Sequence, residues 1–512
     1  MEKQTDNNLR TLLEEELASE ITLVASDQKS KETLIQDFTS ISESIIWNLQ
    51  RQYFEEASIE AWRKGVVPHY ITSSSYMACS YAQMAMAWLQ DQLEEGYDHL
   101  RILELGAGSG QFSFHFLRHL EQQWQQNYPN DILPITYVMS DVTRANIKFW
   151  QSHQALRPWF DTGLLDGAFF DVEKDADLTL ENSGVTWSAS EEKAPMLVLA
   201  NYLFDSIRQD YWQIENNLAQ EVLVASYCPS EVAEKPALHT LNYQYSLVKP
   251  AEKSYSDQSL NELLQFYCQK LKNGVVSIPT YGKSCIDTLK AWCNSQLTLI
   301  AGDKGQSDWQ QFENIDYPVF IHHGSISTSV NFHALRWLAH QEGGHSWICG
   351  QPTDDFKVCA ISWQDEDRLP HFARKCFDFA KNFSPADQFV LKKIIERNYQ
   401  HLNVAEIASY LRFSHYDPKA LKRAIPQLMK LAPQLSAPQV SLMQQFVTRT
   451  WDNYYWLGEK EDLAFMIGCF FYEANDYQSA LVFFNHSVAL YGPDSGTICN
   501  IENCQKMLET LF

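Results

Sequence analysis

The stretch that decides the fold is residues 100–114, LRILELGAGSGQFSF. It begins as a short apolar run typical of a β-strand, and three glycines follow at alternate positions, Gly106, Gly108 and Gly110. Directly after them the pattern becomes helical. Because glycine has no Cβ, the backbone at such a turn can approach a ligand closely, and the first turn of the helix offers free N–H groups. The stretch therefore predicts a ligand-binding loop at the carboxyl end of a strand.

The spacing of the glycines separates two classes of ligand, dinucleotides and S-adenosylmethionine. The dinucleotide fingerprint is G-x-G-x-x-G, and Gln111 stands where its last glycine would be. Glu104, two positions before the first glycine, instead matches the first motif of class I methyltransferases, which the segment ELGAGSG resembles. The resemblance implies a Rossmann-like α/β fold and S-adenosyl-L-methionine as the cofactor.

Composition narrows the functional class. A chain of 512 residues is long enough for two or three domains. The net charge of −24 repels a nucleic-acid backbone and argues against DNA or RNA as a substrate. The polar N-terminus has no signal-peptide core, and no apolar run approaches about 18 residues, so we expect no membrane span. Eleven scattered cysteines without a C-x-x-C pair indicate reduced thiols, a cytoplasmic protein and no metal site.

Alternating strand and helix patterns predict a parallel sheet with crossover helices over residues 66–369. Short alternating segments at about 210–250 predict antiparallel strands inserted into this domain. Residues 1–65 show helical periodicity, and we expect a helical N-terminal segment without chemistry. Residues 302–305, GDKG, follow a predicted strand and are expected to form a turn. The strands of the sheet are expected at 101–105, 135–140, 167–170, 196–200, 275–279, 297–301 and 357–363.

After about residue 370 the strand signals vanish, and residues 370–512 predict an all-α domain. Part of this region resembles one tetratricopeptide repeat, in which small and large residues recur at fixed positions. The matching positions are Gly468, Phe471, Ala480, Phe484 and Ser487. Such repeats need stacked partners, so we expect a tetratricopeptide-like array of two to four helical hairpins. The resemblance implies a concave surface that holds a protein partner.

Acidic residues follow the predicted strands at the positions that a methyl-donor site needs. The three glycines would lie against the methionine and ribose parts of the cofactor, with Glu104 near the methionine ammonium. Asp141, at the end of the next strand, is placed to accept the ribose hydroxyls. Asp171, at the end of the third strand, is the candidate acceptor for the adenine amino group. The alternative for each carboxylate is a solvated position in a loop.

The fourth strand ends in MLVLANYLFD, which places three polar candidates at the edge where open α/β sheets bind ligands. They are Asn201, Tyr202 and Asp205. We expect these residues to act in catalysis, since a carboxylate there can orient a cationic acceptor or remove a proton from the attacking atom. The alternative is that Asn201 caps the next turn and Asp205 is solvated.

The order of the motifs extends the resemblance over about residues 60–365. ELGAGSG, ANYLFD, the hairpin insertion, VVSIPTYG and GSISTSVNFHAL resemble the MidA-type methyltransferases, a family that includes the mitochondrial complex I assembly arginine methyltransferase. The resemblance implies methyl transfer to a protein arginine. Tyr202, Thr280 and Asn331 stand where that family has acidic residues.

These features favour an S-adenosylmethionine-dependent methyltransferase that acts on a protein recruited by the helical tail. Two other functions remain open at this point. One is a cofactor-binding scaffold without turnover, and the other is a methyltransferase of small molecules whose tail serves self-association. The sequence does not name the methyl acceptor.

Overall fold

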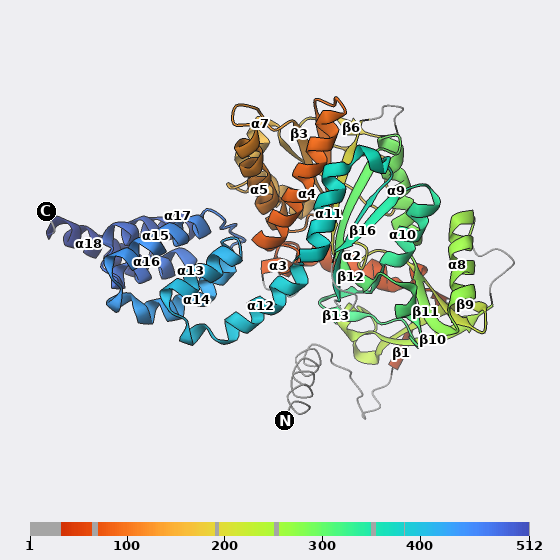
Figure 1. The fold of residues 1–512 in the computed structure, drawn as a ribbon. Helices are drawn as coiled ribbons and strands as arrows, with labels where there is room; N and C mark the ends of the chain where they lie inside the picture. The colour runs from red at the N-terminus through yellow and green to blue at the C-terminus, as the bar shows by residue number, and fades with distance from the viewer. Residues whose placement is uncertain are drawn as a thin grey trace, which may run out of the picture.

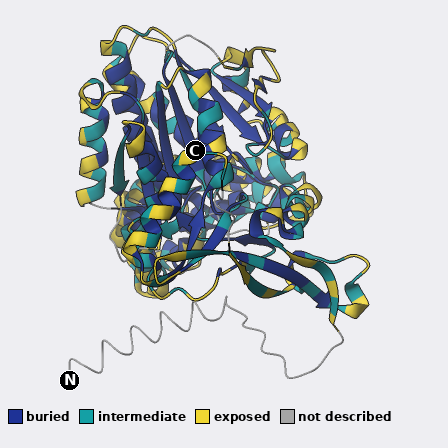
Figure 2. Cartoon of the chain, turned by 90° about the vertical axis from the view of Figure 1, so that its right-hand side faces the viewer, coloured by how far each residue is buried: buried dark blue, intermediate teal, exposed yellow. Residues whose placement is uncertain are grey.

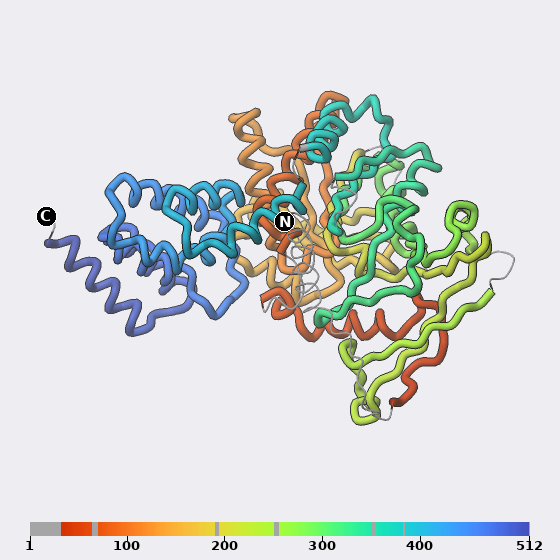
Figure 3. Tube along the Cα trace, turned by 60° about the horizontal axis from the view of Figure 1, so that its bottom comes forward, coloured from red at the N-terminus to blue at the C-terminus, as the bar shows by residue number. Residues whose placement is uncertain are grey.

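The computed structural model describes residues 32–63, 70–189, 194–249, 255–349, 355–382 and 384–510. These residues form a central α/β part, a smaller antiparallel sheet on one side of it, and a helical tail on the other side (Figure 1). A rotated view shows the same arrangement, with the blue tail and the second sheet on opposite sides (Figure 3). Within the described residues, no helix has the length and apolar character that crossing a membrane requires.

The central part is built on a mixed sheet that has eight strands within the described residues. Their order is β16-β17-β12-β7-β2-β3-β4, with the short β15 beside β12. All pairs from β12 to β4 are parallel, whereas β17 is antiparallel to both of its neighbours. The expected α/β class is therefore confirmed, but the sheet is not wholly parallel as expected, because the strand predicted at 357–363 pairs antiparallel. The strands are β2 (Leu100–Leu105), β3 (Ile135–Asp141), β4 (Leu165–Phe169), β7 (Met196–Asn201), β12 (Leu297–Gln306), β15 (Val330–Asn331), β16 (His345–Cys349) and β17 (Phe356–Ser362).

The strand order reverses next to β2. After β2 the chain adds β3 and β4 on one side, and it then returns to add β7 and β12 on the other side. Near the ends of three strands, Leu105 is a direct ladder neighbour of both Ser140 and Ala200. Open α/β sheets bind ligands at the carboxyl ends of the strands where the order reverses. The topology therefore indicates that the loops after β2, β3 and β7 form the functional edge.

Helices cover both faces of the central sheet because its strands are apolar on both sides. Along β2, Ile102 packs into the core on one face and Leu103 into the core on the other, as the alternation of a strand requires. The buried strands, dark blue in Figure 2, lie between helices whose outer surfaces are exposed. One face carries α4 (Ser75–Glu94), α5 (Gln111–Asn127), α6 (Arg144–Ser152), α7 (Arg157–Thr162) and α11 (Pro370–Asn382), and the other carries α9 (Thr280–Trp292) and α10 (Phe332–Gln341).

The second sheet is antiparallel and has five strands within the described residues. Three of them come from the segment expected to be inserted at about 210–250, and the other two come from distant parts of the chain. Helix α2 (Ile45–Ala57) packs on one face of this sheet, and α8 (Gln258–Lys270) packs on the other. The strands are β1 (Glu32–Ser40), β8 (Asp210–Glu215), β9 (Leu218–Pro229), β10 (Asn242–Val248) and β11 (Asn273–Ile278).

Three expectations about local structure are wrong. Residues 32–40, expected to be helical, form β1 and pair with β9, while residues 1–31 lie outside the described residues. The strand expected at 275–279 does not join the parallel sheet, because β11 pairs antiparallel with β8. Residues 302–305 form no turn, since they continue β12 and 302–304 stay paired with β17. In each case the partner strand, which a local pattern does not name, decides the outcome.

The tail is helical, as expected, and α13 to α18 enclose a core of their own. Gly468 on α16 lies against the Phe484 ring of α17, where a Cβ would come within 2.7 Å of the ring, so these two helices pack closely. Helix α11 differs, because Phe372 and Cys376 are fully buried in the core of the central sheet. Residues 370–382, expected in the tail, thus pack with the α/β part. The tail helices are α12 (Pro385–Arg397), α13 (Val404–Phe413), α14 (Pro418–Leu431), α15 (Ala437–Trp451), α16 (Leu463–Glu473), α17 (Tyr477–Tyr491) and α18 (Ser495–Thr510).

The packing of α11 predicts that two phenylalanines on this helix contribute differently to the free energy of unfolding. Phe372→Ala should lower the free energy of unfolding by about 3–5 kcal/mol, because it leaves a cavity in the core. Phe377→Ala is the matched control, since Phe377 is 53% exposed and its loss should change stability by less than about 0.5 kcal/mol. Urea denaturation of both variants measures the difference. Equal effects would contradict the assignment of α11 to the core of the α/β part.

Candidate functional site

A cavity of about 210 Å³ opens at the carboxyl edge of the central sheet. The loops after β2, β3, β4 and β7 form one side of its wall. The other side comes from α2, α3 (Glu60–Arg63) and the hairpin of β13 (Ile321–His323) and β14 (Ser325–Ser327). Most of the residues predicted to bind the cofactor or act in catalysis line this one cavity. They are Glu104, Gly106, Gly108, Asp141, Asp171, Asn201, Tyr202 and Asp205.

The carboxylate of Asp141 joins the loops after β2 and β3. Its Oδ2 accepts a hydrogen bond from the backbone N–H of Gly108 at 3.0 Å, and its Oδ1 accepts one from the N–H of Thr143 at 2.8 Å. Gly108 has φ +56°, a left-handed conformation that favours glycine. Burial raises the pKa of Asp141, and the backbone donors oppose that rise. The predicted ribose ligand therefore also fixes the shape of the glycine loop.

Glu104 lies in the wall, but its hydrogen bonds run into the protein. Its Oε2 accepts from the Ser113 hydroxyl and, at 2.6 Å, from the Tyr137 hydroxyl. Burial raises the pKa of Glu104 to about 7, and the two hydroxyl donors oppose that rise. The carboxyl group thus ties β2 to α5 and β3, and its predicted place near a methionine ammonium stays a prediction.

Gly110 is the predicted cofactor ligand that does not line the cavity. It precedes α5 with φ +77°, and a Cβ on it would meet the side chains of Met139, Trp150 and Tyr455 within about 3 Å. The third glycine therefore serves close packing behind the loop. The sequence pattern could not separate this use from contact with a ligand, because both require the missing Cβ.

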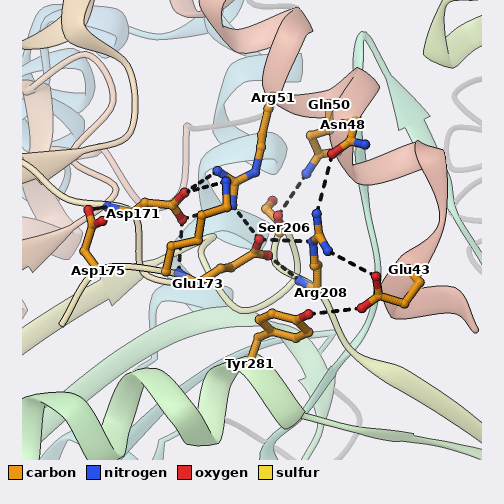
Figure 4. Close-up of polar contacts among 11 residues, drawn as sticks. Glu43, Asn48, Gln50, Arg51, Asp171, Glu173, Asp175, Ser206, Arg208 and Tyr281 are labelled. Carbon is orange, nitrogen blue, oxygen red and sulfur yellow. Dashed lines mark hydrogen bonds and ion pairs between the residues drawn. The ribbon is translucent and has the colours of Figure 1, made fainter.

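Asp171 is held by an arginine from the N-terminal segment. Arg51 of α2 donates to its two carboxylate oxygens at 2.5 and 2.9 Å, and also to Glu173, which in turn pairs with Arg208 (Figure 4). Burial disfavours the charged form of Asp171, but the hydrogen bonds and the charge of Arg51 outweigh it and hold its pKa below the usual value. Arg51 thus ties α2 to the strand end predicted to face the adenine.

The role of Arg51 was missed in the sequence, where residues 1–65 are expected to have no chemistry. The local signal is only that of an amphipathic helix, and its acidic partner lies 120 residues away. Arg51 lines the cavity together with Trp62 of α3. The ring of Trp62 lies so close to Gly108 that a Cβ there would come within 2.8 Å of it. The N-terminal helices therefore cover the glycine loop.

The end of β7 brings two of the predicted catalytic residues to the cavity. The Asn201 amide oxygen accepts from the Tyr81 hydroxyl at 2.9 Å, whereas its buried amide nitrogen has no partner among the described residues. Tyr202 has φ +50°, which is uncommon for a side chain of this size and costs conformational energy. Its N–H donates to the carbonyl of Gly302 at 3.0 Å. Strain at a strand end beside a cavity is typical of a functional position.

Asp205, the third predicted catalytic residue, faces a second buried carboxyl group, Asp303 of β12. The Asp205 N–H donates to Asp303 Oδ2 at 3.2 Å, and the Ser206 hydroxyl donates to Asp205 Oδ1 at 2.7 Å. Burial raises the pKa of Asp205 to about 6, and burial together with the charge of Asp205 raises that of Asp303 well above its usual value. Lys304, in the cavity wall, favours the charged form of Asp205. When two carboxyl groups share a site in this way, ionisation of one raises the pKa of the other.

Asp303 was missed because residues 302–305 were expected to be a turn. An acid two positions after the run LTLIA is the signal that could have found it, since this edge of the sheet carries functional groups. Thr280 and Asn331 are different: neither lines the cavity among the described wall residues. Asn331 caps α10 by accepting from the Ala334 N–H at 2.8 Å. These two departures from the MidA-type pattern lie outside the cavity wall, whereas Tyr202 lies in it.

A family model described as "Putative S-adenosyl-L-methionine-dependent methyltransferase" matches residues 81–348, just over half of the chain. The chain belongs to this family. The match runs from α4 to β16 and includes every strand end around the cavity. The cofactor of the family is S-adenosyl-L-methionine, in agreement with the sequence prediction.

Two crystal structures from Burkholderia thailandensis are similar to this chain. One is of an uncharacterized protein, with 12% identity and a TM-score of 0.40 over 64% of this chain and 87% of that one. The other was solved with S-adenosyl-homocysteine bound, with 12% identity and a TM-score of 0.37 over 63% of this chain and 92% of that one. No curated protein matches the chain.

The wall of the cavity fits the cofactor of the family. The sulfonium and ammonium groups of S-adenosyl-L-methionine are cationic, and the wall carries more acids than bases. Its Asp, Glu, Arg and Lys residues, among those described, are Glu104, Asp141, Asp171, Glu173, Asp205, Arg51 and Lys304. Each oxygen of Asp141 has one hydrogen bond and can accept another. The free amide nitrogen of Asn201 adds a donor at the same edge.

The carboxyl pair predicts a pH-dependent stability. In the unfolded chain Asp205 titrates near pH 4, and in the folded protein near pH 6. Between these values the folded state binds more protons, so the free energy of unfolding falls as the pH rises through this range. Asp303→Asn removes the repulsion and should make the protein more stable than the parent at pH 8, with a smaller difference at pH 4.5.

Urea denaturation at the two pH values measures this effect. Asp161→Asn on α7 is the control, because this carboxylate is 67% exposed and its loss should have little effect at either pH. A stabilisation by Asp303→Asn that is equal at both pH values would contradict the coupling of the two carboxyl groups.

Proposed function

We propose that this chain is a cytoplasmic S-adenosyl-L-methionine-dependent methyltransferase whose methyl acceptor is a protein. The observation that carries the proposal is the place of Asp205, which lines the same cavity as the glycine loop and Asp141. Cofactor-binding groups on β2 and β3 and a candidate proton acceptor after β7 thus meet at one edge. A scaffold that only binds the cofactor would not require a buried carboxyl pair there.

The residues of this chain divide into binding and chemical roles. The backbone at Gly106 and Gly108 and the carboxylate of Asp141 hold the methionine and ribose parts of the cofactor, and Asp171 lies at the adenine end. The bound cofactor supplies an electrophilic methyl group on its sulfonium sulfur. Asp205 accepts the proton that the acceptor atom loses, and a carboxyl group with a pKa of about 6 is suited to this role near neutral pH.

Arginine is the acceptor that the carboxyl pair supports best. A guanidinium group binds carboxylates through paired N–H donors, and Asp205, which contacts the buried Asp303, offers such an acceptor in the cavity wall. The resemblance to the MidA-type methyltransferases implies the same acceptor. In this proposal Asp303 replaces the acid that Tyr202 lacks, because the Tyr202 N–H donates to the carbonyl of Gly302, the residue before Asp303 on β12.

The helical tail would recruit the protein substrate. The close contact of Gly468 with Phe484 between α16 and α17, and the packing of α18 on α17, support a tetratricopeptide-like arrangement. Arrays of this kind offer concave surfaces to peptides and helices. Binding there raises the local concentration of the acceptor near the catalytic edge. This argument favours a macromolecule over a metabolite as the substrate.

Methyl labelling tests the proposal. The intact protein is incubated with S-adenosyl-L-methionine carrying a radioactive methyl group and a lysate of its own host, and the products are separated by size. The proposal expects label in a protein band, and amino-acid analysis of that band should give methylarginine. Label in small molecules alone would contradict a protein acceptor, and no label with intact cofactor binding would indicate a scaffold.

Asp205→Asn separates cofactor binding from chemistry. The variant should lose label incorporation by roughly 100-fold or more, the scale of a lost proton acceptor, while its affinity for S-adenosyl-homocysteine stays within about twofold of the parent. Isothermal titration and the labelling assay measure the two quantities. Asp161→Asn, an exposed carboxylate on α7, is the control and should match the parent in both. An Asp205→Asn variant with full incorporation would show that another group takes the proton.

A further inference from the structure

The loop between α15 and α16 leaves the core of the tail and enters the α/β part. Tyr455 is 2% exposed and Leu457 is 4% exposed, and both belong to the core that packs on the central sheet. Their neighbours in sequence, on α15 and α16, lie in the core of the tail. The loop is thus a point where the tail contacts the methyltransferase part through buried side chains.

Tyr455 reaches the back of the glycine loop. Its hydroxyl donates a hydrogen bond to the backbone carbonyl of Ser109 at 3.0 Å. Its ring stacks on His153, with 3.9 Å between the ring centroids, and lies 5.3 Å from the ring of Phe114 on α5. A Cβ on Gly110 would come within 3.0 Å of the Tyr455 hydroxyl oxygen. The missing side chain at the third glycine of the motif therefore leaves room for a tail residue.

The loop between α15 and α16 also binds α3, the helix that covers the other side of the glycine loop. Arg63, the last residue of α3, donates from Nε to the carbonyl of Leu457 at 2.8 Å. Trp62, directly before it, lines the cavity and lies against Gly108. His153 donates from Nε2 to the carbonyl of Trp456 at 2.9 Å. Three successive tail residues thus bind the back of the glycine loop, the residue that follows α6, and the helix that covers the loop.

We propose that Tyr455 is a positioning residue of the cofactor site, through which the helical tail sets the affinity for S-adenosyl-L-methionine. The inference rests on the cofactor site proposed above. The Ser109 carbonyl is fixed between Gly108, which Asp141 binds, and Gly110, which Tyr455 contacts. Loss of the Tyr455 hydroxyl frees this carbonyl and lets the loop leave the conformation that the cofactor meets. Cofactor binding and events on the tail are then energetically linked, and such linkage is reciprocal.

Tyr455→Phe tests this role because phenylalanine keeps the stacking on His153 and removes only the hydrogen bond. The dissociation constant for S-adenosyl-homocysteine should rise about 3- to 10-fold, as expected for one lost hydrogen bond. In the labelling assay the half-saturating cofactor concentration should rise by the same factor, with an unchanged plateau. Tyr477→Phe is the matched control, since its hydroxyl contacts only the nearby Asn475 among the described residues and both constants should stay at the parent values.

A second variant, Arg63→Gln, removes the hydrogen bond between the Arg63 side chain and the carbonyl of Leu457. It should also weaken the binding of S-adenosyl-homocysteine. The melting temperature of the unliganded variant should stay near that of Tyr477→Phe. The parent is titrated first. No binding by the parent would overturn the cofactor site itself. A parent that binds, with Tyr455→Phe and Arg63→Gln within twofold of it, would overturn the positioning role of the tail and leave the proposed function intact.

Discussion

The bond between the Asp141 carboxylate and the backbone N–H of Gly108 is the contact on which the rest of the site depends. It joins the loops that follow two neighbouring parallel strands, and a second bond to Thr143 fixes the carboxylate itself. Hydrogen bonds to an ionised acceptor are stronger than neutral ones, and burial strengthens them further because the local dielectric constant is low. This contact fixes the left-handed conformation of Gly108 at the edge of the sheet where the strand order reverses.

The carboxylates around this edge have different partners and therefore different roles. Glu104 is tied to Ser113 and Tyr137 below the loop, and Asp171 is neutralised by Arg51. Asp205 faces another acid, Asp303, which makes proton exchange near neutral pH possible. Asp171 and Asp205 thus line the same cavity with opposite shifts in pKa, lowered by Arg51 for the first and raised by burial for the second. In the function proposed above, the first belongs to cofactor binding and the second to chemistry.

The part of the site that lies in continuous motifs could be predicted from the sequence. The strand before Gly106, the acid at Asp141 and the polar residues from Asn201 are local signals, and the structure brings them to one cavity. The parallel alternation of strands and helices follows from the same local patterns. Such predictions succeed because a βα unit places its loop at the carboxyl edge whatever its neighbours are.

The rest of the site depends on contacts between distant segments. Arg51 lies in an ordinary amphipathic helix, and Asp303 lies within β12, a strand that was expected to end at residue 301. β11 has an apolar run that suits either sheet, so only its pairing with β8 decides its place. Tyr455 comes from a helical tail that was expected to fold apart from the cofactor site. No local pattern reports such partners.

Hydrogen exchange of the intact protein tests the central claim most directly, namely that the cofactor binds at the loops after β2, β3 and β4. Amide exchange is followed by mass spectrometry with and without saturating S-adenosyl-homocysteine. The account predicts slower exchange in peptides that cover residues 104–112, 141–146 and 170–175, and no such change with NAD. Unchanged exchange in all three peptides, or protection by NAD in place of S-adenosyl-homocysteine, would contradict it.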